Sequence, residues 1–227
     1  MKHLLLLHGA IGSKNQLQGL AGSLAGAFHL YSIDFSGHGG QEIEREFSIE
    51  YFADQIRQWL RENAINKINI FGYSMGGYVA MYLAAHHPEL VDGIITLATK
   101  YEWTEEISAK EASMLNSLTI ETKVPEFAAQ LQQRHHPSDW KVVLAETARM
   151  LHKMGQQPPL SQADFSRINC RVLLLLGDRD KMVTQEETMK VYKLLPQAQL
   201  EILPNTPHPI EKIDVTALAS LIKRFLQ

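Results

Sequence analysis

Gly72-Tyr73-Ser74-Met75-Gly76-Gly77 is the most informative stretch of this 227-residue chain. The run Ile68–Phe71 before it is short and apolar, which predicts a buried strand. The segment Met75–His86 after it predicts a mostly apolar helix that ends before Pro88. Glycines at positions 72 and 76 lack the Cβ atoms that would collide where a strand and a helix pack closely. The stretch therefore predicts a sharp turn from a central strand into a helix.

Short apolar runs alternate with helix-length amphipathic stretches along most of the chain. Strands are expected at Lys2–Leu7, Phe28–Ile33, Ile68–Phe71, Gly93–Ala98, Arg171–Leu176 and Gln199–Leu203. Helices are expected at Leu17–Ala27, Ile49–Asn63, Met75–His86, Thr184–Leu195 and Ile213–Leu226. This spacing predicts an α/β fold: a mostly parallel, doubly wound sheet of about six strands with helices on both faces.

The region between Lys100 and Asn169 interrupts this alternation, because it contains no strand pattern. Helices are expected there at Trp103–Leu118, Val124–Gln133 and Ser138–Met154. Open parallel sheets bind ligands at the carboxyl ends of their strands, so an all-helical insertion is expected to cover those ends as a lid. We therefore predict an α/β core of residues 1–99 and 166–227, with a helical cap at residues 100–165.

Composition narrows the possible partners. The formal net charge is −3 and charged residues make up 21% of the chain, so no strongly basic field is available for nucleic acid or an anionic membrane. No apolar run approaches the roughly 18 residues of a membrane span, and the apolar start soon turns polar, which argues against a secretory leader. The single cysteine, Cys170, cannot form an intrachain disulfide. The expected location is therefore the cytoplasm, with an unknown oligomeric state.

Ser74 is the candidate reactive group. A serine between two glycines, directly after a strand and before a helix, is the pattern of a nucleophile elbow, which projects the hydroxyl above the sheet. A serine hydroxyl needs a base, and in this kind of fold the acid and the histidine follow it in later loops. The fifth predicted strand ends before Asp178 and Asp180, and the sixth is followed by His208. Order along the chain leaves both aspartates open as the acid.

Several stretches share the pattern of one family: Leu7-His8-Gly9-Ala10, Asp34-Phe35-Ser36-Gly37-His38-Gly39, the elbow, Gly177-Asp178-Arg179-Asp180, and His208. On these residues the sequence resembles the α/β-hydrolase family, in its compact bacterial form with a helical cap. The resemblance implies a triad of Ser74, His208 and Asp180. It also implies an oxyanion hole formed by the N–H groups of Ala10 and Met75. The first two strands of the family are expected to be absent.

The activity that this resemblance implies is hydrolysis of an ester-like bond through an acyl-enzyme, on a small or medium, largely apolar acyl substrate, as in carboxylic ester hydrolases. No cofactor and no metal are expected. One alternative is a lyase or carbon–carbon bond hydrolase on the same triad, similar to the menaquinone-pathway lyases, although Tyr78 stands where those enzymes place an arginine. A second alternative is a non-catalytic ligand-binding protein.

Other chemistry-bearing residues have simpler interpretations. In the family, His8 shapes the oxyanion loop, and Asp34 and His38 are expected to serve turn structure and hydrogen bonding. The adjacent pairs His86-His87 and His135-His136 point about 100° apart on a helix and do not converge on a metal, so surface positions are expected. Cys170 is expected to be a small buried side chain.

The apolar residues of the predicted cap must pack against one another or line the space beneath it. They are Trp103, Met114, Leu115, Leu118, Phe127, Leu131, Trp140, Met150, Leu151 and Met154. Because most are large and hydrophobic, we expect a largely apolar cavity that methionine side chains help to adapt.

Overall fold

The structure, a computed structural model, describes residues 1–227. Six strands form one sheet with the order β2-β1-β3-β4-β5-β6, and every neighbouring pair is parallel. The strands are β1 (His3–Leu7), β2 (His29–Ile33), β3 (Ile68–Tyr73), β4 (Val91–Leu97), β5 (Arg171–Gly177) and β6 (Ala198–Leu203). The predicted parallel sheet of six strands is therefore confirmed.

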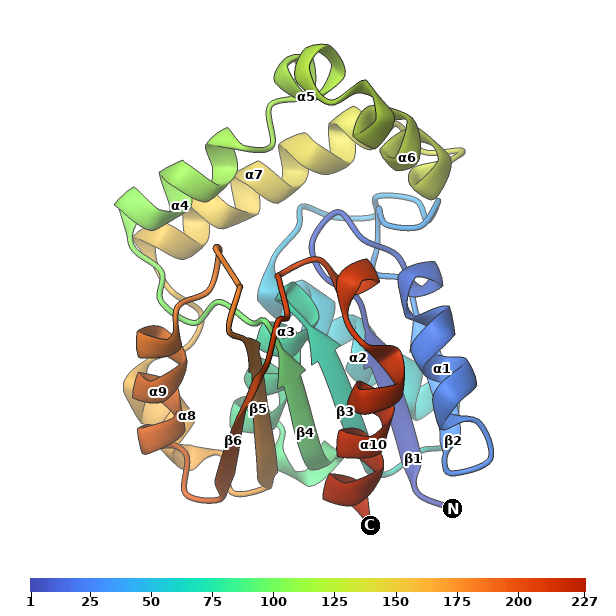
Figure 1. Cartoon of the computed structure of the whole chain (residues 1–227), viewed down its shortest axis with the longest axis vertical. Coiled ribbons are helices and arrows are strands. Elements are labelled where there is room, and N and C mark those ends of the chain that lie inside the picture. Colours follow the sequence, from blue (N-terminus) through green and yellow to red (C-terminus); the bar gives the residue numbers. More distant parts are fainter.

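Helices cover both faces of this sheet (Figure 1). Side chains alternate along β1, so that Leu5 and Leu7 enter one hydrophobic cluster while Leu4 and Leu6 enter the other. On the face of Leu5 and Leu7, the cluster includes residues of α2 (Ile49–Glu62), α3 (Met75–His86), α8 (Gln162–Arg167) and α9 (Gln185–Leu194). On the face of Leu4 and Leu6, it includes residues of α1 (Gln18–Leu24) and α10 (Val215–Leu226). Each buried leucine contributes about 1.5–3 kcal/mol, so both faces hold the sheet in place.

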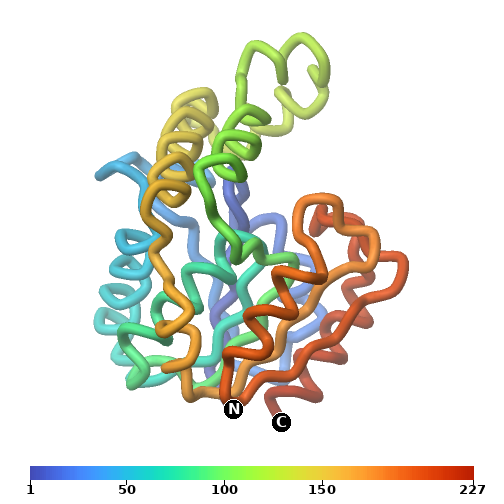
Figure 2. The backbone as a smooth tube through the Cα atoms, turned by 90° about the vertical axis from the view of Figure 1, so that its left-hand side faces the viewer, coloured from blue at the N-terminus to red at the C-terminus, as the bar shows by residue number.

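The remaining α-helices lie in one stretch of chain between β4 and β5, while three short 3-10 helices lie elsewhere, at Lys14–Leu17, Pro88–Leu90 and Ile210–Lys212. They are α4 (Glu105–Ser113), α5 (Ser117–Lys123), α6 (Pro125–His135) and α7 (Trp140–Gln156), here called the α4–α7 segment. Figures 1 and 2 show this segment beyond the carboxyl ends of the strands, while both chain termini lie at the opposite end of the molecule. The segment therefore stands where parallel sheets bind their ligands.

Two helix predictions are corrected by the structure. The stretch Trp103–Leu118 is not one helix, because the Asn116 side chain accepts a hydrogen bond from the Thr119 N–H (2.8 Å) and starts α5 after a break. The short helix α8 was not predicted; a capping box between Ser161 and Asp164 begins it. Because α8 spans position 166, the division between core and cap at that position stays a prediction. No helix is both long enough and apolar enough to cross a membrane.

Candidate active site

The serine turn has the strained geometry that its sequence implies. Ser74 joins β3 to α3 with φ 51° and ψ −117°, in a region that costs about 1–3 kcal/mol for a residue other than glycine. Its N–H donates to the Leu97 carbonyl (2.8 Å), and its carbonyl accepts from the Thr99 hydroxyl (3.0 Å). Hydrogen bonds on both sides of the residue thus hold the turn in place.

The glycines of this turn are required by close packing. A Cβ atom at position 72 would lie 2.4 Å from the backbone nitrogen of Gly77. A Cβ atom at position 76 would lie 2.7 Å from the carbonyl oxygens of Leu7 and His8. Each of these contacts involves backbone that cannot move aside, so both positions need glycine for α3 to approach β3 and β1.

The loops after β5 and β6 bring an aspartate and a histidine together. The Nδ1 atom of His208 lies 2.8 Å from Oδ2 of Asp180. The other oxygen of Asp180 accepts hydrogen bonds from the N–H groups of Met182 (2.8 Å) and Val183 (2.9 Å). Burial alone would raise the pKa of Asp180, but the hydrogen bonds from His208 and from the backbone hold this pKa below its ordinary value. The carboxylate therefore stays charged and fixed beside the imidazole.

Asp178 lies elsewhere in the same loop. Its Oδ1 atom accepts a hydrogen bond from the Thr206 N–H (3.1 Å), and its Oδ2 atom lies 3.8 Å from Nε of Arg179. The structure thus resolves the choice that chain order leaves open, because Asp180 alone contacts His208.

Ser74 and His208 line the same cavity. Their side chains are not hydrogen-bonded to each other in this structure, in which His208 contacts Asp180 through its ring and Tyr73 through its carbonyl. The Tyr73 hydroxyl donates to that carbonyl (3.1 Å), and the two rings are 5.7 Å apart. The hydrogen bond between a nucleophile and its base often tightens only when substrate binds.

Two backbone N–H groups are available near Ser74. Met75 is the first residue of α3, where N–H groups lack partners within the helix. The N–H of Ala10 donates to no other group of the chain. Both residues line the cavity together with Ser74, and they are the two residues from which the sequence predicted an oxyanion hole. That role stays a prediction.

His8 supports the loop that carries Ala10. Its Nε2 accepts a hydrogen bond from the Phe35 N–H (3.2 Å), so Nδ1 carries the proton and donates to the Gly9 carbonyl (2.8 Å). Burial lowers the pKa of His8 to about 4, so the ring is neutral at physiological pH. A neutral ring with both nitrogens in use fits the expected structural role.

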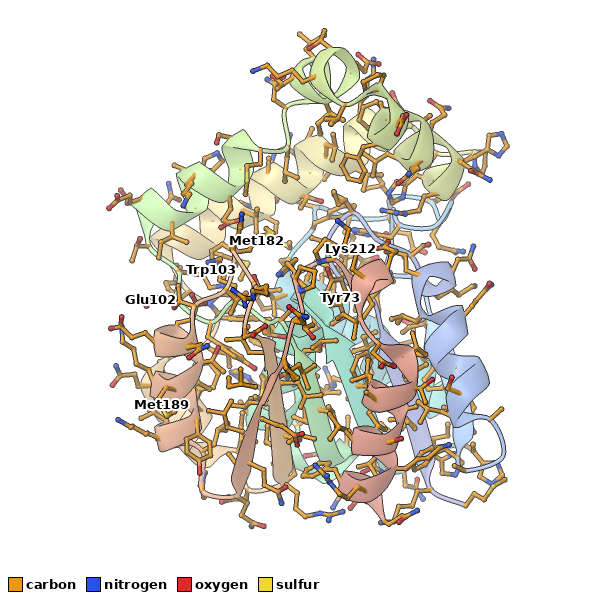
Figure 3. All side chains as sticks on the ribbon, viewed as in Figure 1. Tyr73, Glu102, Trp103, Met182, Met189 and Lys212 are labelled. Atoms are coloured by element: carbon orange, nitrogen blue, oxygen red, sulfur yellow. The ribbon has the colours of Figure 1, made fainter.

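The cavity has a volume of about 750 Å³, and 17 of its 29 lining residues are hydrophobic. Figure 3 shows Tyr73, Trp103, Met182 and Lys212 around the region between the strand ends and the α4–α7 segment. Seven of the ten apolar residues named from sequence line it: Trp103, Met114, Leu115, Phe127, Met150, Leu151 and Met154. The other three do not, since Leu118 is exposed and Leu131 and Trp140 fill a small core within the segment.

Charged and amide side chains also line the cavity, and sequence reasoning missed them. They are Gln16, Lys100, Glu111, Gln130, Arg134, Glu211 and Lys212. They belong to no motif, and in the sequence they look like ordinary surface residues, so no local pattern could have identified them. Tyr78, which stands where the lyases mentioned above place an arginine, is buried and accepts a hydrogen bond from the Leu160 N–H (3.3 Å).

Two smaller expectations need correction. His135 is not on the surface: it is fully buried and hydrogen-bonded at both ring nitrogens. The reason is that α6 ends against the loops that follow β1 and β2, which sequence periodicity does not reveal. Cys170 is half-buried rather than fully buried, and burial raises the pKa of its thiol to about 11.

Comparison with known proteins finds a matching family model, similar sequences and similar solved structures. The sequence matches the family model described as alpha/beta hydrolase fold over residues 2–210. A pimeloyl-[acyl-carrier protein] methyl ester esterase of Neisseria meningitidis is 24% identical over 245 residues, which cover 100% of this chain and 77% of that protein. Lipase 1 of Psychrobacter immobilis is 27% identical over 239 residues, or 94% and 74% of the two chains. A solved putative lipase of Acinetobacter baumannii has a TM-score of 0.85 at 21% identity, covering 99% of this chain and 83% of its own.

Proposed function

Because the chain belongs to the alpha/beta hydrolase fold family, we propose that it is a serine hydrolase that cleaves an ester bond of a small or medium, largely apolar acyl substrate. The observation that carries the proposal is the 2.8 Å contact between His208 and Asp180 at the edge of the cavity that Ser74 also lines. These three residues come from three separate loops, and a nucleophile, a base and an orienting acid are the parts that acyl transfer needs.

In the proposed acylation step, the Ser74 hydroxyl attacks the ester carbonyl carbon while Nε2 of His208 removes its proton. Asp180 holds the Nδ1–H of His208 and stabilises the imidazolium that forms. The negative charge on the carbonyl oxygen is received by the N–H groups of Ala10 and Met75. Loss of one such donor typically costs about 10²–10³ in rate, so these backbone groups contribute as much as a side chain would.

The second step returns the enzyme to its starting state. The imidazolium of His208 gives its proton to the leaving alkoxide, and the acyl group remains as an ester on Ser74. His208 then removes a proton from water, whose oxygen attacks the acyl carbonyl and releases the carboxylic acid. The proton returns to the Ser74 oxygen, so the cycle consumes one water for each ester.

The substrate class follows from the cavity. Its volume of about 750 Å³ and its mostly hydrophobic lining suit an acyl chain of small or medium size. The named relatives support the same class, since one is a methyl ester esterase and another a lipase. We further propose that residues 100–165 act as a cap that closes over the bound acyl group and excludes bulk water.

The test is hydrolysis of p-nitrophenyl acetate and butyrate by the Ser74→Ala variant. We expect kcat/KM to fall by at least about 10³-fold, because the nucleophile is lost. The matched control is Ser166→Ala, which removes an exposed hydroxyl that bonds only to the Gln162 carbonyl, and which should keep wild-type rates. Unchanged turnover by the Ser74→Ala variant would exclude this serine from the reaction.

A further inference from the structure

The loop that carries Ala10 contains a strained residue. Ile11 has φ 51°, in the left-handed region that a β-branched side chain rarely adopts. Such a conformation is strained and persists only where neighbouring groups hold it. Ile11 follows directly after the N–H donor proposed for the oxyanion, so whatever holds Ile11 also sets the direction of that donor.

Two adjacent residues of α6 hold the Ile11 carbonyl. His135 contacts it through Nε2 (3.0 Å), and Arg134 donates to it through Nη1 (3.0 Å). The Gly39 N–H donates to Nδ1 of His135 (3.2 Å), so Nε2 carries the proton and is the donor to Ile11. His135 thus links the loop after β1 and the loop after β2 to the end of α6.

His135 differs from Arg134 in one decisive way. Arg134 lines the cavity and can contact substrate directly, whereas His135 is fully buried and does not line it. Burial lowers the pKa of His135 to about 4, so the ring stays neutral and keeps this hydrogen-bond pattern at physiological pH. His135 therefore affects catalysis only through its neighbours, and its two hydrogen bonds go to Ile11 and Gly39.

We infer that His135 is a positioning residue, which holds the strained Ile11 turn from the α4–α7 segment and so aims the Ala10 N–H at the reacting carbonyl oxygen. This inference rests on the proposed function and extends it to a residue with no contact to substrate. It means that the oxyanion hole is complete only while the α4–α7 segment packs against the loop that carries Ile11. When α6 moves away, the Ile11 carbonyl loses both of its α6 donors.

The test compares variants of His135 with a matched control on p-nitrophenyl butyrate. His135→Phe fills the space without either hydrogen bond, and His135→Gln keeps one donor and one acceptor. Ser138→Ala is the control, because the Ser138 hydroxyl joins the same stretch of chain to the Gln41 carbonyl (3.0 Å) without touching Ile11. His135→Asn, too short to bridge Ile11 and Gly39, is the second disabling variant in case the phenylalanine variant does not fold.

We expect His135→Phe to lower kcat by about 10- to 100-fold, since a donor misplaced by about 1 Å loses much of its effect. The KM should change less than about threefold, because no side chain that lines the cavity is replaced and the main loss is in stabilisation of the transition state. The rate of labelling of Ser74 by a fluorophosphonate, which also passes through a tetrahedral state, should fall in parallel. His135→Gln should recover most of the loss, and Ser138→Ala should match the wild type.

The outcomes separate this inference from the proposed function. Wild-type kcat in folded His135→Phe and His135→Asn, in a protein whose turnover depends on Ser74, overturns the inference and leaves the proposed function intact. A loss that appears mainly in KM, or that the glutamine variant does not restore, also overturns it. Wild-type protein without any Ser74-dependent turnover overturns the proposed function itself.

Discussion

The hydrogen bonds of individual side chains determine that Asp180, and not its neighbour Asp178, contacts His208. Asp180 is tied to His208 and to two backbone N–H groups, whereas Asp178 bonds to the Thr206 N–H and faces Arg179. An asparagine at position 180 can still bond to the backbone, but it cannot stabilise the imidazolium. Only the carboxylate of Asp180 is therefore expected to matter for the chemistry.

The prediction is that Asp180→Asn lowers kcat by roughly 10³- to 10⁴-fold, while Asp178→Asn stays within about threefold of the wild type. The measurement is steady-state hydrolysis of p-nitrophenyl butyrate, with folding of both variants checked by circular dichroism. Equal losses in the two variants would show that the loop, rather than the carboxylate beside His208, is what the reaction needs.

The site residues differ in how far the sequence could reveal them. Ser74 was predictable because its turn needs glycine at fixed positions, and such steric needs leave a local pattern. The pairing of Asp180 with His208 depends on how two loops 28 residues apart meet, so only the family resemblance favoured it over Asp178. The places of Arg134 and His135 depend on how α6 packs on the core, and no local pattern records that packing.

Among the secondary-structure elements, the junction of α4 with the core contains a buried ion cluster. The ammonium group of Lys100 lies 3.6 Å from Oε1 of Glu111 on α4 and 3.7 Å from Oε2 of Glu187 on α9, with all three side chains mostly buried. Lys100 also donates to the carbonyl of Met182, whose N–H binds Asp180. One cation thus joins the start of the α4–α7 segment to the loop of the proposed acid.

Removal of that cation should destabilise the protein. Lys100→Met leaves the buried carboxylates of Glu111 and Glu187 without their cation, and we expect the free energy of unfolding to fall by about 3 kcal/mol. The matched control is Lys190→Met, which removes an exposed cation that pairs with Glu102 (3.3 Å; labelled in Figure 3) and with Glu186 (3.5 Å) and should cost much less. Urea unfolding of both variants measures the difference, and equal costs would contradict the importance of this cluster.

The elements themselves were predictable to different degrees. Six strands were found close to their observed ends, because an apolar run between turn residues is a local signal. The break between α4 and α5 and the short helix α8 were missed, since each depends on a single capping side chain, Asn116 or Ser161. Capping residues are common in loops as well, so their presence alone does not mark a helix start.

The molecule as a whole holds a chain of three buried histidines that joins its core to the α4–α7 segment. His38 lies between His8 and His135, with ring centroids 5.1 and 5.9 Å away. Burial lowers the pKa of His8 and of His135 to about 4, and that of His38 well below its usual range. Protonation of any of these three rings is therefore unfavourable in the folded protein.

This arrangement predicts a loss of stability in mild acid. In the unfolded chain each histidine binds a proton near pH 6.5, whereas in the folded protein His8 and His135 do so only near pH 4. The unfolded state thus binds more protons between these values, so stability is highest above pH 6.5 and falls as the pH is lowered towards 4. Between pH 7 and 5 the loss should be on the order of 2 kcal/mol for each of these two histidines.

Urea unfolding at several pH values measures this slope. The His135→Gln variant has one titratable ring fewer. Its free energy of unfolding should therefore depend less on pH, by the contribution of one histidine. Ser138→Ala, which removes no titratable group from the same stretch of chain, should leave the slope unchanged. A wild-type free energy of unfolding that is constant from pH 7 to 5 would contradict neutral burial of these rings.

For the whole molecule, the sequence predicted the order of strands and helices along the chain and an all-helical segment over the strand ends, but not the contacts through which the α4–α7 segment meets the core. The alternation of the core reflects local patterns that repeat, and parallel sheets allow few topologies for them. The contacts of α6 with the loops after β1 and β2 join residues about a hundred positions apart through side chains of ordinary type, such as His135 with Gly39.

The most direct measurement is mass spectrometry of the protein after exposure to a fluorophosphonate, which reacts with serines that a histidine activates. We expect one adduct per chain, located on Ser74, with labelling at least about 10³-fold slower in the His208→Ala variant. A folded protein that takes up no label, or one labelled at the same rate without His208, would show that Ser74, His208 and Asp180 do not act together.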